Sequence, residues 1–498
     1  MATLNLIDLA VIALVMIAVT WLGHHLSGSI ASRRSFFEAD GSLPWWAVSA
    51  SIIATLVSSV TFVAVPAAVF IDGGNLTYLQ VIIGLALGKL FIASILVRSF
   101  YESEGINTTY EYIGARIDAK TGTLSMWVGL GLNLINSAIK LLTAAIVLDV
   151  ISQWGIVACC LAVVAFSMLW SALAGIKTVI WTDFLLFVMF ASGAVFALVY
   201  LALQIQAPLP DALLWLDAEA KLILFDFSTD PQRRYTLWAA IIGSIGLSLA
   251  LGGTQGTWQR VKACRSVADA RKAYNYSALF YLLHLVILGV GLALALFYRE
   301  QPLASDVATA ISAQPDRIFP YFIVTEIPVG LSGLFIAAIF AAAISTLDSA
   351  MTESAELTVR HLYEPLIRPD ASEAHYLRVS RLSLLFWGLA FAAGAVFINR
   401  FSGEGLLDLT FKLPNYLYGA IFGTILLARM GRGRLSSFLV GFASASGCVA
   451  VLASYQIAFF WWCPVSGLLM VCVVLLCEQL MPAKVDISPG AAAPADNR

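Results

Sequence analysis

The chain has 498 residues, of which 60% are hydrophobic and only 12% are charged, whereas soluble domains carry about 25% charged residues. This composition excludes an ordinary soluble fold and indicates a protein embedded in membrane lipid. The formal net charge of −2 leaves no basic surface for nucleic acid, and the seven cysteines show no paired Cys-x-x-Cys spacing that would bind a metal.

Thirteen apolar runs are long enough to cross a membrane. A hydrocarbon layer of roughly 30 Å needs about twenty residues of helix, and in lipid a helix satisfies every backbone amide within such a run. The sequence therefore predicts an all-α polytopic membrane protein of about thirteen transmembrane helices. The runs fall near residues 5–24, 45–70, 76–98, 123–151, 155–174, 178–203, 235–255, 274–298, 327–358, 379–399, 404–428, 434–454 and 457–481.

Lysine and arginine gather on one side of these runs. If the N-terminus is outside, the inner loops and the C-terminal tail hold 20 of the 29 basic residues and the outer loops hold 6; the other three, Lys89, Lys140 and Lys412, lie within spans. The positive-inside rule then predicts a multi-pass protein of the plasma (inner) membrane with its N-terminus outside and its C-terminus cytoplasmic. We expect residues 1–481 to form the transmembrane domain. Residues 482–498, rich in Ala, Pro and Asp, are expected to form a disordered cytoplasmic tail.

Two runs, five spans apart, contain residues that interrupt or loosen a helix. The second run holds Ser58, Ser59, Thr61 and Pro66, and the seventh holds Gly243, Gly246, Gly252 and Gly253. The offset predicts two five-helix halves of opposite orientation, spans 2–6 and 7–11. Broken first helices in inverted halves mark the central binding site of many transporters. Alternatively, the glycines serve only to let helices pack closely.

The ninth run places two hydroxyl residues beside an aspartate, since Ala341 to Ser349 reads Ala-Ala-Ala-Ile-Ser-Thr-Leu-Asp-Ser. Sodium is a hard cation that binds oxygen ligands, and the adjacent hydroxyls of Ser345 and Thr346 can reach one ion where a helical turn is widened. The alternative is that these hydroxyls bond back to carbonyls one turn earlier.

The sixth run begins with another acidic residue, Asp183. An ionised carboxylate inside a span is costly unless a cation compensates it, which makes such a residue a functional candidate. The alternative is a salt bridge at the membrane interface.

Further motifs accompany these residues. They are Leu43-Pro44-Trp45-Trp46-Ala47-Val48 followed by Ser51-Ile52-Ile53-Ala54, then Tyr110-Glu111-Tyr112-Ile113 with Arg116, Trp181-Thr182-Asp183, and Gln255 with Gln259-Arg260. Together with the ninth run, their order and spacing from about residue 5 to residue 455 resemble the sodium/solute symporter family, which includes sodium/proline, sodium/galactose and sodium-coupled monocarboxylate symporters. Thr254 departs from the family pattern, which has an aspartate there.

The resemblance implies a LeuT-type fold and the co-transport of sodium ions. In the family, an alanine carbonyl and two hydroxyls on the corresponding helix ligate sodium, and the matching residues here are Ala342, Ser345 and Thr346. Backbone carbonyls of an unwound second helix complete the sodium shell, at positions that correspond to Ala54 and Val57. Asp183 is a further candidate for this metal site.

The solute site is expected where the second helix unwinds. In the sodium/galactose relatives the position of Thr61 holds glutamine, and polar or aromatic residues stand where this chain has Leu247 and Ala250. Because a sugar needs many fixed hydrogen-bond partners, the resemblance favours a monocarboxylate, a vitamin or an amino-acid-like solute over a sugar. The candidate substrate residues are Ser58, Ser59, Thr61, Phe62 and Gln80.

Two charged residues inside spans are candidates for coupling. Lys140 lies in the middle of the fourth run, and Asp348 follows the hydroxyl pair of the ninth. Lys140 could balance Asp183 or Asp348, or it could bind a carboxylate of the solute. The alternative is that its stem follows the apolar surface so that the ammonium reaches an interface.

The resulting hypothesis is sodium-driven symport of a small organic solute, with sodium, the solute and membrane lipid as the partners. Sodium would hold the broken helix in the conformation that binds solute, and its gradient would drive the exchange between outward-open and inward-open states. A solute sensor built on the same bundle is the alternative. An enzyme is not expected, because no nucleophile elbow, phosphate loop or histidine-rich metal motif is present in the sequence.

Overall fold

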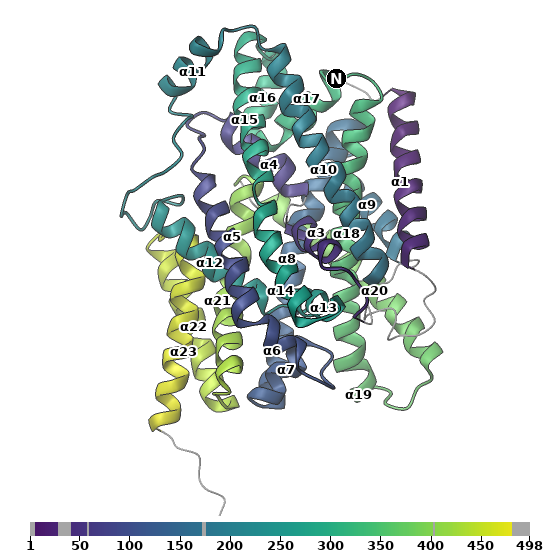
Figure 1. Cartoon of the computed structure of the whole chain (residues 1–498), viewed down its shortest axis with the longest axis vertical. Coiled ribbons are helices and arrows are strands. Elements are labelled where there is room, and N and C mark those ends of the chain that lie inside the picture. The colour runs from purple at the N-terminus through teal and green to yellow at the C-terminus, as the bar shows by residue number, and fades with distance from the viewer. Residues whose placement is uncertain (1–4, 28–40, 57–58, 172–175, 402–403, 481–498) are drawn as a thin grey trace, which may run out of the picture.

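The computed structural model describes residues 5–27, 41–56, 59–171, 176–401 and 404–480. Within these ranges the chain is a bundle of helices without a β-strand (Figure 1). The α-helices are α1 (Leu6–Ser27), α3 (Trp45–Leu56), α4 (Ser59–Phe70), α5 (Tyr78–Ile95), α6 (Val97–Tyr101), α7 (Thr109–Arg116), α8 (Ala119–Ser152), α9 (Ile156–Ser171), α10 (Ile176–Gln204), α11 (Leu209–Ala218), α12 (Leu237–Gly252), α13 (Gln255–Ala263), α14 (Val267–Phe280), α15 (Leu283–Glu300), α16 (Ser305–Ala313), α17 (Ile318–Thr325), α18 (Leu331–Thr358), α19 (Glu364–Leu366), α20 (Glu373–Phe401), α21 (Leu406–Met430), α22 (Leu435–Ser454) and α23 (Trp462–Leu480). Short helical segments of other pitch are η1 (Pro315–Arg317), η2 (Val359–Tyr363) and η3 (Phe459–Trp461).

Each of the thirteen expected runs coincides with one helix or with two consecutive helices. By length and hydropathy, eight helices of the described ranges can cross a membrane, or ten if each of two bent pairs is one span, and shorter apolar helices cover Leu6–Leu22 and Ile156–Met168. The all-helical multi-span fold is therefore confirmed, whereas the count of thirteen stays a prediction. Residues 482–498, Val57 and Ser58 lie outside the described residues.

Both runs that the sequence marks as irregular are bent. The axes of α3 and α4 differ by 52°, and those of α12 and α13 differ by 69°. The first pair is the second expected run. In the second pair, α12 is the seventh expected run and α13 lies just beyond it, so each predicted five-helix half begins with a bent pair of helices. The first half runs from α3 to α10 and the second from α12 to α21. Short helices cap the bundle, with α11, α16 and α17 at one end and α6, α7 and α19 at the other (Figure 1).

Threonines satisfy the backbone where α12 ends. The carbonyl of Leu251 accepts hydrogen bonds from the hydroxyls of Thr254 at 2.7 Å and Thr257 at 2.8 Å. Thr109 of α7 donates its hydroxyl to the carbonyl of Gly253 at 3.1 Å. Because the last carbonyls of a helix have no partner inside it, these bonds let α12 stop within the bundle and α13 leave at a new angle.

The glycines of α12 serve packing and breakage at different positions. A Cβ at Gly243 would lie 2.3 Å from the carbonyl oxygen of Phe460, so this glycine is a close-packing position. On the neighbouring helix α5, a Cβ at Gly84 would lie 2.7 Å from the Cβ of one serine of α12, and a Cβ at Gly88 would lie 2.2 Å from the Cβ of another. Gly252 ends α12 at the break, and it is also tightly packed, since a Cβ there would lie 2.8 Å from the Cδ1 atom of Leu96. Close packing therefore occurs along the run, and the break coincides with its last glycines.

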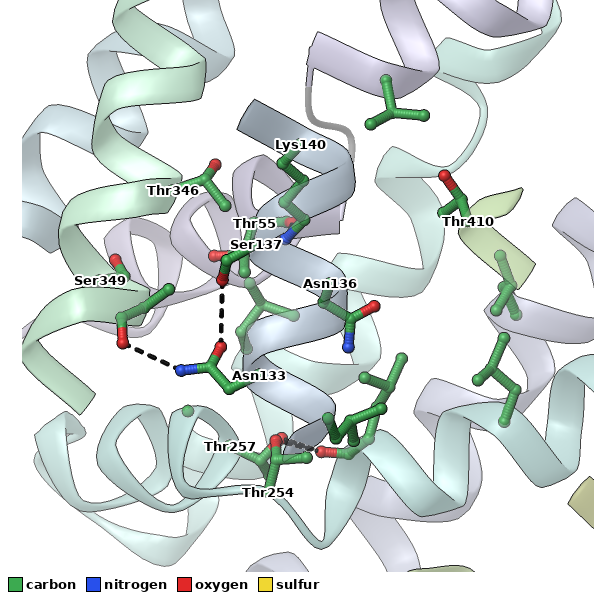
Figure 2. Close-up of a pocket in the computed structure, with 18 of the residues that line it drawn as sticks. Thr55, Asn133, Asn136, Ser137, Lys140, Thr254, Thr257, Thr346, Ser349 and Thr410 are labelled. Atoms are coloured by element: carbon green, nitrogen blue, oxygen red, sulfur yellow. Dashed lines mark hydrogen bonds between the residues drawn. The ribbon is translucent and has the colours of Figure 1, made fainter. Parts of the chain in front are cut away.

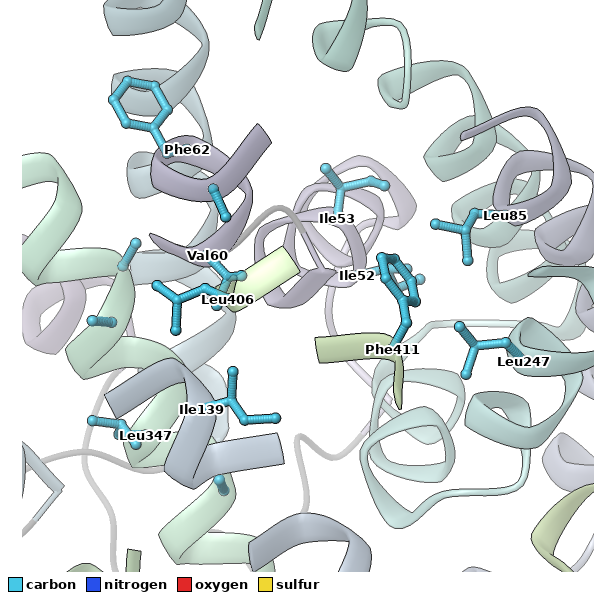
Figure 3. Packing of buried hydrophobic residues seen from close by; sticks show 14 of the residues in the cluster. Ile52, Ile53, Val60, Phe62, Leu85, Ile139, Leu247, Leu347, Leu406 and Phe411 are labelled. Carbon is cyan, nitrogen blue, oxygen red and sulfur yellow. The ribbon is translucent and has the colours of Figure 1, made fainter. Parts of the chain in front are cut away.

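Apolar side chains fill the space around the two breaks. Ile52, Val60, Leu247 and Phe411 belong to one continuous cluster of buried side chains that joins the two halves (Figure 3). The helix α3 packs against α10 and α14, α4 packs against α15, and α18 packs against α8, α10 and α20. Polar residues of α3, α10, α13 and α18 are held between these packed helices.

Candidate functional site

Asp183 of α10 is the meeting point of several helices. The residue is 3% exposed, and its side-chain oxygens accept hydrogen bonds from the hydroxyls of Ser51 at 2.6 Å and Ser345 at 2.5 Å. The guanidinium of Arg260 lies 3.5 Å from the same carboxylate. Ser51 belongs to α3, Ser345 to α18 and Arg260 to α13. One buried carboxylate therefore connects both broken helices to α10 and α18.

Arg260 is itself held by further bonds. Its Nε donates to the Ser51 hydroxyl at 3.2 Å, one terminal nitrogen donates to the Gly256 carbonyl at 3.1 Å, and the other donates to the Thr55 hydroxyl at 2.5 Å. The side chains of Arg260 and Asp183 are only 7% and 4% exposed. The partner of Asp183 is thus a cation inside the bundle, and the pair does not lie at an open surface.

The sequence does not predict this role of Ser51 or Arg260, although both belong to motifs of the family resemblance. The sequence does indicate that Asp183 has a cationic partner, because a carboxylate inside a span needs a cation to compensate its charge. Arg260 follows the seventh apolar run closely and counts as a loop residue by hydropathy. It returns to the interior because α13 bends away from α12 by 69°.

The two hydroxyls of the ninth run have different partners. Ser345 donates to Asp183, whereas Thr346 donates to the carbonyl of Ala342, one turn earlier, at 2.8 Å. Bonding back to the helix, the alternative considered for both hydroxyls, therefore occurs at Thr346 but not at Ser345. Ala342 is 4% exposed, and Ala54 of α3 is 7% exposed. Val57 is outside the described residues.

A cavity of about 210 Å³ lies at the breaks of the two bent helices, next to this cluster. Figure 2 shows that Lys140, Asn136 and Ser137 of α8 face it together with Thr346 of α18. Its polar and charged lining residues are Thr55, Thr61, Tyr78, Lys89, Tyr110, Asn133, Asn136, Ser137, Lys140, Thr254, Thr257, Gln259, Arg260, Tyr274, Tyr281, His284, Thr346, Ser349, Glu353, Thr410 and Tyr418.

The predicted solute residues are distributed unevenly around this cavity. Thr61 lines it. Ser59 is fully buried, and its hydroxyl has no hydrogen-bond partner in the described part of the chain. Phe62 does not line the cavity but packs on other rings, with centroids 5.2 Å from Phe190 and 5.1 Å from Phe319. Ser58 lies outside the described residues.

Gln80 lies apart from the cavity lining and is occupied by backbone groups. Its amide nitrogen donates to the carbonyls of Thr77 at 3.1 Å and Tyr235 at 2.8 Å, and its amide oxygen accepts from the backbone N–H of Asp226 at 3.2 Å. These bonds attach the segment before α12 to the start of α5. In this structure both ends of the Gln80 amide are therefore engaged by backbone groups.

Lys140 and Asp348 take separate places. The Lys140 ammonium donates to the carbonyl of Thr55, in the last turn of α3, at 3.2 Å and points into the bundle (Figure 2). A cation at the C-terminal end of a helix is favourably placed for the helix dipole. Asp348 is 1% exposed and accepts a hydrogen bond from Thr352 at 3.4 Å. Its side chain is not part of the cavity lining.

In the described ranges, no three side chains of His, Cys, Asp or Glu come together as a metal site. The oxygen-rich cluster consists of one carboxylate, hydroxyls and a carbonyl from Asp183, Ser345, Thr346 and Ala342. Within this cluster, the charge of Asp183 is compensated by Arg260.

Comparison with known proteins places this arrangement among transporters. The chain is 27% identical over 433 residues to the human sodium/iodide cotransporter, covering 84% of this chain but only 65% of that relative's length. It is 24% identical over 457 residues to a sodium/sialic acid symporter of Proteus mirabilis, covering 90% of this chain and 89% of that symporter. Other relatives at 24 to 26% identity are named for monocarboxylates, glucose and vitamins.

The fold also matches a solved structure. A substrate-bound, outward-open Na⁺-coupled sialic acid symporter superposes with a TM-score of 0.82 at 22% identity, covering 96% of this chain and 98% of the other. The LeuT-type fold predicted from the sequence is thus confirmed. Residues 36–441 match the model of the sodium:solute symporter family. The chain belongs to the sodium:solute symporter family, whose members are sodium-coupled membrane transporters and not enzymes.

Proposed function

We propose that the chain carries a small organic anion across the membrane together with sodium, and that the solute is a monocarboxylate, a vitamin-like acid or an amino-acid-like acid in preference to a sugar. The observation that supports this class is the charge of the cavity lining. Among the described lining residues the cations are Lys89, Lys140 and Arg260, and the acid is Glu353. Arg260 already pairs with Asp183, which leaves two lysines and one acid. An anion in the cavity would offset this excess of positive charge.

The names of relatives give the proposal partial support. Iodide and sialic acid are anions, as are monocarboxylates, but one relative is named for glucose. A sugar would have to replace its hydration with many fixed partners. In this cavity the seventh expected span contributes two leucines, Leu247 and Leu251, and one polar residue, Thr254, to the lining. An acid that needs one strong charge contact is the better match.

Sodium would bind beside the cavity at Asp183, Ser345, Thr346 and the carbonyl of Ala342, with Ala54 and Val57 as further backbone ligands. A cation there would strengthen the contact of α10 and α18 with α3. Because α3 and α13 meet at Asp183 and both border the cavity, ion and solute would stabilise the same arrangement of the broken helices. Their binding free energies would thereby be coupled.

Transport would follow from rocking of one group of helices against another, as the inverted halves suggest. The moving group would comprise α3 with α4, α5, α12 with α13, and α14 with α15. The opposing group would comprise α8, α9, α18 and α20. We place the N-terminus outside and the C-terminus in the cytoplasm, as the distribution of basic residues predicts.

The direct test is uptake by proteoliposomes that contain the purified chain. We expect an inward sodium gradient to drive uptake of pyruvate, nicotinate or pyroglutamate, and potassium to give no such uptake. Glucose serves as the neutral comparison. Sodium-driven uptake of glucose but of none of these acids would contradict the proposed solute class, and sodium-dependent binding without any uptake would favour a sensor.

The proposed sodium ligands can be tested separately. We expect Ser345→Ala and Thr346→Ala each to raise the sodium concentration for half-maximal uptake by about fivefold or more, because each removes an oxygen near one ion. Ser380→Ala is the matched control, since Ser380 is 3% exposed and donates only to the carbonyl of Tyr376 one turn earlier. It should leave the sodium response unchanged. Equal effects of Thr346→Ala and Ser380→Ala would mean that Thr346 only bonds to its own helix.

A further inference from the structure

Lys89 is a buried cation that neither the family resemblance nor the sodium cluster explains. It lies on α5, is 3% exposed and lines the cavity. Its position is fixed, because a Cβ at the adjacent Gly88 would lie 2.2 Å from the Cβ of Ser248 on α12. The backbone of α5 is therefore held close against α12, and Lys89 cannot leave the cavity wall by a small shift of its helix.

The ammonium of Lys89 has no hydrogen bond or ion pair within the described part of the chain. Its contact there is with the face of the Tyr274 ring, whose centroid lies 5.9 Å away. Other lysines that are buried or half-buried differ in this respect. Lys140 donates to one carbonyl, Lys221 donates to three, and Lys412 pairs with Glu404.

A second unpaired donor lies on the wall that faces α5. Tyr281 is 2% exposed, lines the cavity, and its hydroxyl has no partner in the described ranges. Tyr281 and Tyr274 are seven residues apart, about two helical turns, and both contribute to the lining. The unpaired ammonium belongs to a residue that lines the cavity and calls for a ligand with acceptor groups, since buried donors without partners are strongly disfavoured. The Tyr281 hydroxyl is enclosed by protein, so this part of the described chain offers no acceptor to it either.

We infer that Lys89 binds the anionic group of the transported solute and thereby selects carboxylates over their neutral analogues. This inference rests on the proposed function and names the residue that would set its specificity. Lys140 would then influence sodium binding and not solute binding, because its ammonium already donates a hydrogen bond to the carbonyl of Thr55 at the end of α3. A ring face and an ammonium on one wall suit a carboxylate carried by a small planar body.

The test compares acids with amides of nearly the same shape. Pyruvate is paired with pyruvamide and nicotinate with nicotinamide, and binding to the purified full chain in sodium sulfate is measured by thermal shift. We expect Lys89→Met to weaken binding of the acid by about tenfold or more, the loss of a charge-assisted contact, and to leave the weaker binding of the amide unchanged. Lys89→Arg, which keeps the charge, should retain a preference for the acid.

Two controls separate this role from general effects of charge. Lys272→Met removes an exposed lysine of α14 and should change nothing. Lys140→Met should shift the sodium titration and leave the ratio of acid to amide affinity near that of the wild type. If Lys89→Met misfolds, Lys89→Gln, which keeps a donor without the charge, supplies the same comparison.

The outcomes are distinguishable. If the wild type takes up an acid with sodium but Lys89→Met and Lys89→Gln keep its ratio of acid to amide affinity, the inference about Lys89 is overturned and the proposed function stands. If the wild type neither binds nor carries any of the acids, the proposed solute class fails and the inference fails with it. If chloride alone protects the wild type and competes with pyruvate, but no acid is carried, Lys89 holds an inorganic anion and the inference is overturned.

Discussion

Asp183→Asn is expected to reduce sodium-driven uptake by more than about tenfold while the protein still folds. The amide keeps the size of the side chain, but its single oxygen can accept from only one of the two hydroxyls of Ser51 and Ser345, which bond to different oxygens of Asp183. It removes the negative charge that a sodium ion would need. Arg260 loses its ion pair but keeps bonds to Ser51, Gly256 and Thr55. Breaking a buried pair costs about 3–5 kcal/mol, so thermal stability should fall without loss of the fold.

The measurement is initial uptake over a range of sodium concentrations, with the melting temperature recorded in parallel. Asp149→Asn is the control, since Asp149 pairs with Arg317 at 2.8 Å outside the cavity and is 12% exposed. It should lower stability slightly and leave the sodium response intact. A wild-type sodium response in Asp183→Asn would make the carboxylate purely structural.

The fold follows closely from the sequence because its main determinants are local. About twenty apolar residues make a span wherever they occur, and the residues that interrupt the second and seventh runs coincide with the two bent pairs. The intramembrane position of Asp183 is likewise visible in one dimension. Hydropathy cannot distinguish a loop from a polar helix that turns back into the bundle. For this reason the sequence places α13 and Arg260 in a loop.

The lining of the cavity was harder to predict, because it depends on segments that are far apart in the sequence. Gln80 looks available in the sequence, yet the segment before α12 folds over it and supplies partners 146 and 155 residues away. Phe62 lies next to Thr61 in the sequence but on another side of α4, where it meets Phe190 and Phe319. Lys89 is surrounded by apolar residues, so nothing in the pattern shows that its helix presents it to a cavity.

Arg260→Gln is expected to make the stability of the protein depend more strongly on sodium, because it leaves the charge of Asp183 without its cation. Without the guanidinium, the buried carboxylate has lost its closest cation, and the fold should be destabilised by about 3–5 kcal/mol in sodium-free buffer. A sodium ion can take over part of this compensation. We therefore expect added sodium, but not potassium, to raise the melting temperature of Arg260→Gln by more than it raises that of the wild type. Arg317→Gln, which breaks the pair with Asp149, should show the wild-type response.

The double variant Asp183→Asn/Arg260→Gln completes the cycle and decides what the pair does. Ligand binding stabilises a fold by RT ln(1 + [L]/Kd), about 2.7 kcal/mol at one hundred times Kd, so a lost ion site appears as a lost thermal shift. The double variant should regain stability relative to Arg260→Gln in sodium-free buffer, because no charge is left unpaired. If Asp183 binds sodium, the double variant should also lose the extra stabilisation by sodium. Equal sodium shifts in the wild type, both single variants and the double variant would leave the pair as a structural link between α10 and α13.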